Sequence, residues 1–143
     1  YMKENGAHIL DPHVPLAGDK KAFTKAISEC HGLTIEEWLA LKRHERDSRI
    51  YSHDIKLVDQ ATHIVALLNG TSFGVGMELQ RAFDKPKLGL TTTPVLGLLH
   101  DDNSEKISPM ITGATHIHKQ FVIKHYKTLA DAKKIVFEFL TMK

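Results

Sequence analysis

Continuous apolar runs mark three short segments of the chain, at residues 64–68, 94–99 and 121–123. Runs that are continuous rather than alternating are typical of strands covered on both faces in a parallel sheet. A shorter apolar run at residues 7–10 predicts another strand. The stretch that follows it, residues 11–19, contains two prolines and a glycine and predicts a loop.

Helical spacing of apolar residues fills the segments between these runs. Residues 20–49 predict a helix interrupted near Gly32. Its second half begins at Thr34, with Glu37 three positions later, which is the spacing of a capping box. Apolar residues within 48–60 recur at helical intervals and predict a further helix.

In the C-terminal half, predicted helices again alternate with the apolar runs, except at residues 100–118. The stretch GVGMELQRAF, residues 74–83, opens a helix, and a last helix begins at Thr128 with Asp131 at its third position. Residues 100–118 are polar and contain a proline and a glycine. They predict mostly loop with one helical turn.

Strands that alternate with helices predict an α/β fold, a three-layer Rossmann- or flavodoxin-like parallel sheet with helices on both faces. The length fits one domain spanning residues 1–143, since a single core of that size can bury roughly two thirds of the unfolded surface. Such sheets bind ligands beyond the carboxyl ends of their strands. Residues 68–78 follow one of these ends and are therefore the expected site.

The amino-acid composition argues against several classes of binding partner. The 19 Lys and Arg residues against 17 acids give a formal charge of +2, and the densest basic stretch, residues 42–49, contains two acids and no aromatic residue that could stack on a base. No nucleic-acid partner is expected. Cys30 is the only cysteine, which excludes an intrachain disulfide and favours the cytoplasm. No apolar run reaches the roughly eighteen residues of a membrane span, so no membrane partner is expected.

Two carboxylates occupy positions where buried helix faces should be apolar. Glu78 shares a stripe with Val75, Leu79 and Ala82, and Asp54 lies in the same way on the preceding helix. An ionised carboxylate is costly to bury alone, so each should pair, neutralise or face a cleft. Two of them, on helices flanking one strand, predict a functional pair in a shared cleft.

The same positions also fit structural ion pairs. In that interpretation Asp54 meets Arg49 or Lys56, and Glu78 meets Arg81. Either arrangement offsets the cost of burying a carboxylate. The pattern alone leaves both interpretations open.

The helix bearing Glu78 begins with a glycine-rich sequence suited to an anion. Gly74 and Gly76 allow a ligand to approach the backbone, and the free N–H groups of the helix start, with the Ser72 hydroxyl, suit a phosphate. Leu79 stands where a dinucleotide fingerprint has its third glycine, and the lysine of a P-loop is absent. A tight helix start that binds no ligand is the alternative.

Histidine and cysteine give no catalytic or metal signature. His116 and His118 have the character of metal ligands, but no HExxH or Cys-x-x-Cys pattern accompanies them. No metal or other cofactor is therefore expected. A Ser-His-Asp triad is not indicated, because no G-x-S-x-G sequence occurs. Cys30 is interpreted as a structural thiol.

Four segments of the chain are informative when they are taken together: SHDIKLVDQATHIVALL, TSFGVGMELQRA, TPVLGLLH and SPMITGA. Their most specific part joins Asp54, the series Ser72-x-Gly74-x-Gly76-x-Glu78, and the later series that begins at Ser108. Together they resemble the nucleoside 2-deoxyribosyltransferase-like superfamily, and most closely its Rcl-type 2'-deoxynucleoside 5'-monophosphate N-hydrolases. The resemblance extends from about residue 7 to the end of the chain.

This resemblance implies roles for individual residues. Glu78 corresponds to the nucleophile that attacks the anomeric carbon of deoxyribose, and Asp54 to its partner, which protonates the departing base or holds the substrate. Ser72 and the Gly74 amide correspond to ligands of the 5'-phosphate. Ser108 corresponds to a serine that reaches the phosphate across a homodimer interface, so a homodimer is implied.

Three features depart from that family. Its first strand and glycine-rich loop have no counterpart before residue 7, so the predicted sheet lacks a central strand, which we expect residues preceding Tyr1 to supply. Met77 replaces a common aromatic residue, which would reshape the pocket near the base or sugar. Residues 28–47 form an insertion suited to a lid or a partner surface.

The implied reaction is hydrolysis of the N-glycosidic bond of a nucleoside 5'-monophosphate, preferably a 2'-deoxy one, to free base and sugar 5-phosphate. Ser72 and Ser108 favour a monophosphate over a nucleoside, because their donors would otherwise lack an anion. Two alternatives stay open. One is a deoxyribosyltransferase that passes the sugar to another base, and the other is a non-catalytic nucleotide-binding module.

Overall fold

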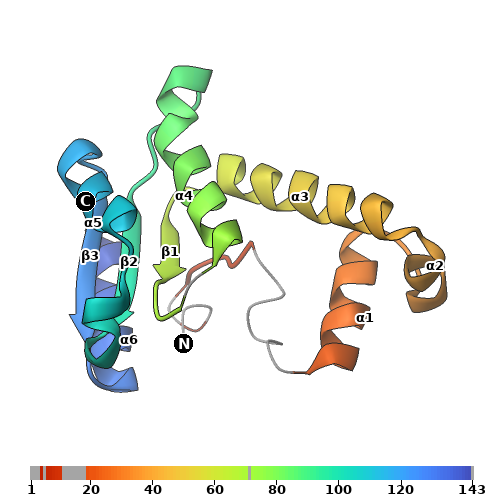
Figure 1. Cartoon of the computed structure of the whole chain (residues 1–143), viewed down its shortest axis with the longest axis horizontal. Coiled ribbons are helices and arrows are strands. Elements are labelled where there is room, and N and C mark those ends of the chain that lie inside the picture. The colour runs from red at the N-terminus through yellow and green to blue at the C-terminus, as the bar shows by residue number, and fades with distance from the viewer. Residues whose placement is uncertain (1–3, 5, 11–18, 71, 143) are drawn as a thin grey trace. The chain divides into compact units, whose positions relative to one another are not determined.

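The structure is a computed structural model that describes residue 4 and residues 6–10, 19–70 and 72–142 (Figure 1). It divides into two compact units. The helical unit comprises Ile9–Leu57, and the sheet unit comprises Val58–Lys143 together with Tyr1–His8. Each unit is described by itself.

The helical unit contains α1 (Lys20–Cys30), α2 (Ile35–Ala40) and most of α3 (Arg43–Gln60). The last turn of α3 belongs to the sheet unit. The predicted capping box of α2 is present, because the Glu37 N–H donates to Thr34 Oγ1 over 3.1 Å and the Thr34 N–H donates to the Glu37 carboxylate over 2.8 Å. The interruption near Gly32 is confirmed, and a second break separates α2 from α3.

The sheet unit is built on three parallel strands in the order β1 (Ile64–Leu67), β2 (Val95–His100) and β3 (Phe121–Tyr126). Ile64 pairs with Val95, and Val95 pairs with Phe121. All three continuous apolar runs are therefore strands of one parallel sheet, as predicted.

Helices cover both faces of this sheet. Alternate residues of β2 serve different faces: Val95 and Leu99 join the cluster beneath α4 (Phe73–Asp84) and α5 (Pro109–Ile117), whereas Leu96 and Leu98 join the cluster beneath α6 (Leu129–Thr141). Burial of β2 on both sides explains its unbroken apolar sequence. The α/β class with helices on both faces is confirmed.

The two clusters divide the core between them. The larger contains residues of β1, β2, α4 and the last turn of α3, and the smaller joins β2 to α6. Their buried members are Val58, Ala66, Leu68, Leu79, Ala82, Phe83, Val95, Leu99 and Phe121 in the first, and Leu96, Leu98, Val136 and Phe139 in the second.

Gly97 lies in the middle of β2 because its neighbours leave no space for a side chain. A Cβ at this position would lie 2.6 Å from Leu68 Cδ1 and 3.2 Å from the Phe121 ring. The central strand therefore packs closely against the side chains that follow β1 and begin β3.

Two local predictions were wrong. Residues 7–10 form no strand, since none of them pairs with β1, β2 or β3, and an apolar run without a ladder partner has no reason to stay extended. Residues 100–118 are mostly helical rather than loop, with a 3₁₀ segment at Asp101–Lys106 followed by α5. Pro109 occupies the first turn of α5, where its missing N–H costs nothing. The predicted loop at 11–19 lies outside the described residues except for Asp19, the N-cap of α1.

Candidate active site

The start of α4 is the centre of the predicted site, and Ser72 is its N-cap. Ser72 Oγ accepts a hydrogen bond from the Val75 N–H over 3.3 Å. Gly74 and Gly76 lie within the helix itself, and neither has a positive φ. A Cβ at Gly76 would meet no atom within 4 Å. Among the described residues, packing therefore leaves space beside Gly76.

Glu78 lies farther along the same helix, at the edge of the buried stripe. Leu79 and Ala82 are buried in the core and Val75 packs against it, whereas Glu78 is half-buried. Met77, its neighbour, is 54% exposed. The predicted apolar stripe is confirmed, and Glu78 is a half-buried residue at its edge.

Asp54, the predicted partner of Glu78, is a half-buried residue of α3. It belongs to the helical unit, whereas Glu78 belongs to the sheet unit. A shared cleft for the two carboxylates therefore stays a prediction.

Arg81, the structural partner considered for Glu78, makes two hydrogen bonds with Asp59. Its Nε and Nη2 donate to the two carboxylate oxygens of Asp59 over 2.8 and 2.7 Å. These hydrogen bonds hold the pKa of Asp59 below its usual range. The paired donors fit the fork of a guanidinium to both oxygens and join the end of α3 to α4.

Ser108 caps the second helix on this face of the sheet. Its Oγ accepts from the Met110 N–H over 3.2 Å. Both α4 and α5 start on the side of the sheet where β1 and β2 end, so Ser72 and Ser108 lie on the carboxyl side predicted for a ligand. The contribution of Ser108 to a second subunit stays a prediction.

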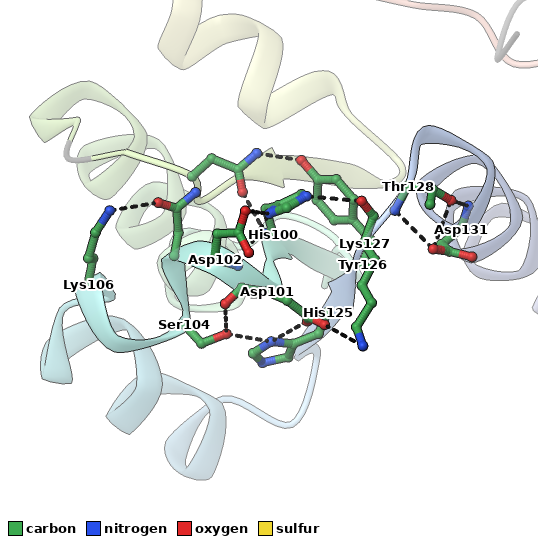
Figure 2. A network of polar contacts seen from close by, with 12 residues as sticks. His100, Asp101, Asp102, Ser104, Lys106, His125, Tyr126, Lys127, Thr128 and Asp131 are labelled. Atoms are coloured by element: carbon green, nitrogen blue, oxygen red, sulfur yellow. Dashed lines mark hydrogen bonds and ion pairs between the residues drawn. The ribbon is translucent and has the colours of Figure 1, made fainter.

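A polar cluster at the ends of all three strands was missed by the sequence analysis (Figure 2). Asn69, two residues after β1, accepts a hydrogen bond at Oδ1 from the His100 N–H over 2.6 Å and donates from Nδ2 to the Tyr126 hydroxyl. The His100 ring lies edge-on to the Tyr126 ring at 5.2 Å. We call Asn69, His100 and Tyr126 the strand-end cluster.

A second group of polar residues extends this cluster along β3. The Asp101 carboxylate lies 3.5 Å from His125 Nδ1 and 3.7 Å from Lys127 Nζ, and the Ser104 hydroxyl donates to the Asp101 carbonyl over 2.7 Å. The available signal was the polar sequence directly after a buried strand, which is where α/β sheets place functional groups. The polar sequence of residues 100–118 predicts mostly loop instead.

One of the two histidines considered as metal ligands packs against an aromatic ring instead. His118 stacks on Phe83, with ring centroids 4.2 Å apart and an interplanar angle of 12°. Its ring therefore extends the apolar core. Within the described part of the chain, His, Cys, Asp and Glu form no group of three suited to a metal ion.

Two further features are the exposure of the cysteine and the length of the helices. Cys30, interpreted from the sequence as a structural thiol, is exposed at the end of α1. Among the helices that the structure describes, none is both long and apolar enough to cross a bilayer.

Comparison with known proteins identifies the family, although no family model matches the chain. The sequence is 30% identical over 95 residues to "5-hydroxymethyl-dUMP N-hydrolase" of Branchiostoma floridae, covering 66% of this chain and 83% of that protein. The chain belongs to the 2'-deoxynucleoside 5'-phosphate N-hydrolase family. It is also 26% identical over 112 residues to "Putative 2'-deoxynucleoside 5'-phosphate N-hydrolase 1" of Thermofilum pendens, covering 71% of this chain and 74% of that protein. The resemblance first seen in the Rcl-type motifs is confirmed at the level of the N-hydrolase family.

Proposed function

We propose that this protein hydrolyses the N-glycosidic bond of 2'-deoxynucleoside 5'-monophosphates, releasing the free base and deoxyribose 5-phosphate. Membership in the N-hydrolase family is the observation that carries the proposal. The position of Glu78 supports it, since a half-buried carboxylate stands on a helix whose first turn offers Ser72 and two glycines.

In the proposed chemistry Glu78 is the nucleophile and Asp54 the acid. The Glu78 carboxylate attacks the anomeric carbon as the bond to the base breaks, and the departing base takes its electron pair together with a proton from Asp54. Water then attacks the same carbon, gives one proton to the Asp54 carboxylate, and releases the Glu78 carboxylate and the sugar phosphate. Paired carboxylates serve related oxocarbenium-like reactions in glycosidases.

The phosphate group would bind at the start of α4. The N–H groups of a first helical turn lack partners within the helix, and the helix dipole favours an anion there. Ser72 and the Gly74 amide supply the donors, whereas the Gly76 N–H donates within the helix to the Ser72 carbonyl oxygen over 3.3 Å. The open space around Gly76 supports close approach. Met77, 54% exposed beside Glu78, would contact the sugar or base.

Base release from matched substrates tests this proposal. Purified protein is incubated with the common 2'-deoxynucleoside 5'-monophosphates and with the corresponding nucleosides, and free base is quantified by chromatography. We expect release from at least one monophosphate, faster than from its nucleoside. Faster exchange than hydrolysis after addition of a second free base would identify a transferase instead. Binding of a monophosphate without release would identify a non-catalytic module.

We propose further that the active unit is a homodimer in which Ser108 completes the partner's phosphate site. Mixing Glu78→Gln with Ser108→Glu subunits tests this arrangement. A hybrid dimer has one site with intact Glu78 and an intact Ser108 from its partner, so two nearly inactive variants should recover activity on mixing. Inactive mixtures that contain hybrid dimers, verified by tagging each variant, would contradict it.

A further inference from the structure

We infer that Asn69 is a positioning residue, which holds the phosphate-binding start of α4 in register with the ends of β2 and β3. The inference rests on the proposed function, because it concerns how the chain keeps the start of α4 in place. It arises from the strand-end cluster, which none of the predicted site residues includes.

Asn69 occupies the connection that determines where α4 begins. It follows β1 by two residues and precedes the N-cap Ser72 by three. Its amide has two functions at once, accepting from the backbone at the end of β2 and donating to a side chain at the end of β3. One side chain therefore joins the chain leading to α4 to both other strands.

The partners of Asn69 are themselves held in place. Tyr126 packs against the smaller apolar cluster, and its ring contacts the half-buried His100 ring at 5.2 Å. The two nitrogens of His100 are both engaged, Nδ1 with the Asp102 N–H over 3.3 Å and Nε2 with the Lys127 carbonyl over 3.0 Å. Asn69 is thus bonded to groups that have little freedom to follow it.

Alanine or apolar side chains could not reproduce this link. A carboxamide offers an acceptor and a donor at the two ends of one short, planar group. An anion site made of backbone N–H groups depends on where the backbone lies, so a small shift of the first turn of α4 weakens phosphate binding. Glu78 lies farther along α4, where Leu79 and Ala82 fix the helix in the core, so the chemical step should change less. Asn69 is therefore expected to act on substrate affinity.

Steady-state kinetics of Asn69→Ala with a 2'-deoxynucleoside 5'-monophosphate tests the inference. We expect KM to rise about tenfold while kcat stays within about twofold, a change of roughly 1.4 kcal/mol in kcat/KM. Inhibition by deoxyribose 5-phosphate should weaken by a similar factor. Tyr126→Phe removes one of the two partners and should raise KM about threefold. The double variant should be no worse than Asn69→Ala, because both act through the same link.

Asn103→Ala is the matched control, since Asn103 lies on the same side of the sheet and accepts a bond only 3.4 Å long from the exposed Lys106. Its KM should equal that of the wild type. A fall in kcat at constant KM for Asn69→Ala would indicate simple loss of folded protein and overturn the inference, as would unchanged kinetics. If Asn69→Ala does not fold, Tyr126→Phe decides by the same criterion. A wild-type protein that releases no base from any monophosphate removes the proposed function and this inference together.

Discussion

The two ends of the parallel sheet use charged and polar residues in different ways. At the amino end, Lys85 is only 1% exposed and donates to the carbonyl oxygens of Val58 and Ala61 and to Thr93 Oγ1. At the carboxyl end, Ser72, Gly74 and Met77 are exposed and Glu78 is half-buried. The amino end is closed around its charge, whereas the carboxyl end presents polar groups to solvent.

The two ends differ because the unpaired backbone groups of the helices there have opposite polarity. Val58 and Ala61 lie at the end of α3, where the last carbonyl groups of a helix lack partners and favour a cation. Lys85 supplies that cation, although burial lowers its pKa. The N–H groups at the start of α4 have the opposite polarity and remain near solvent. Stability is therefore expected to depend on the amino end, and substrate chemistry on the carboxyl end.

Replacing Glu78 by Gln should give the largest effect. We expect kcat to fall at least a thousandfold, about 4 kcal/mol, because the amide cannot act as the nucleophile. Thermal unfolding should change little, since the substitution keeps the shape of a half-buried side chain. Glu138→Gln, on the exposed surface of α6, serves as control and should keep full activity. A Glu78→Gln protein with near-normal kcat would remove Glu78 from the chemistry.

Replacing Lys85 by Met should lower stability and leave activity unchanged, the reverse of the Glu78 variant. The variant removes the donor to the Val58 carbonyl oxygen and to Thr93 Oγ1 in the buried interior, while the Ala61 carbonyl oxygen still accepts from the Thr93 hydroxyl over 3.1 Å. We therefore expect the free energy of unfolding to fall by about 2 kcal/mol. Activity per folded molecule should be retained. Urea unfolding measures the change, with Lys87→Met as control, since Lys87 is an exposed neighbour paired with Asp84. Equal stability of the two variants would show that the Lys85 contacts contribute no net stability.

Replacing Ser72 by Ala should affect both properties moderately. Loss of the N-cap should lower the free energy of unfolding by about 1 kcal/mol, and loss of a phosphate donor should raise KM by about tenfold. Thr128→Ala removes the N-cap of α6 and controls for the capping effect alone. That control should lose similar stability at constant KM, and identical KM values for the two variants would exclude Ser72 from substrate binding.

The smallest effect concerns the ion pair of Asp59 with Arg81 and depends on pH. The pKa of Asp59 is lowered in the folded protein from the ordinary value of 3.8, so the pair stabilises the fold above that value. The contribution should disappear as the pH falls through the lowered pKa. We expect Asp59→Asn to cost about 1 kcal/mol at pH 7 and progressively less as the pH is lowered below 3.8, measured by urea unfolding over a pH series. A cost that is independent of pH would attribute the effect to packing.

Local sequence patterns were sufficient where neighbouring residues decide the structure. The capping boxes at Thr34 and Thr128 were predictable because each joins residues three positions apart. The apolar runs of β1, β2 and β3 were predictable because burial on both faces requires continuous apolar sequence. Residues 7–10 resembled these runs but form no strand, since extended structure depends on a partner that local sequence does not specify.

The sequence by itself determined the α/β class, the stripe that holds Glu78 and the helix starts near Gly74 and at Thr128, because each follows from spacing within one element. Only the tertiary structure brought Asn69 to His100 and Tyr126 and placed Lys85 against the end of α3. Those contacts join residues that are 27 to 57 positions apart, as from Lys85 to Val58 and from Asn69 to Tyr126. They exist because parallel strands with helical crossovers bring equivalent ends of separate elements to one edge of the sheet.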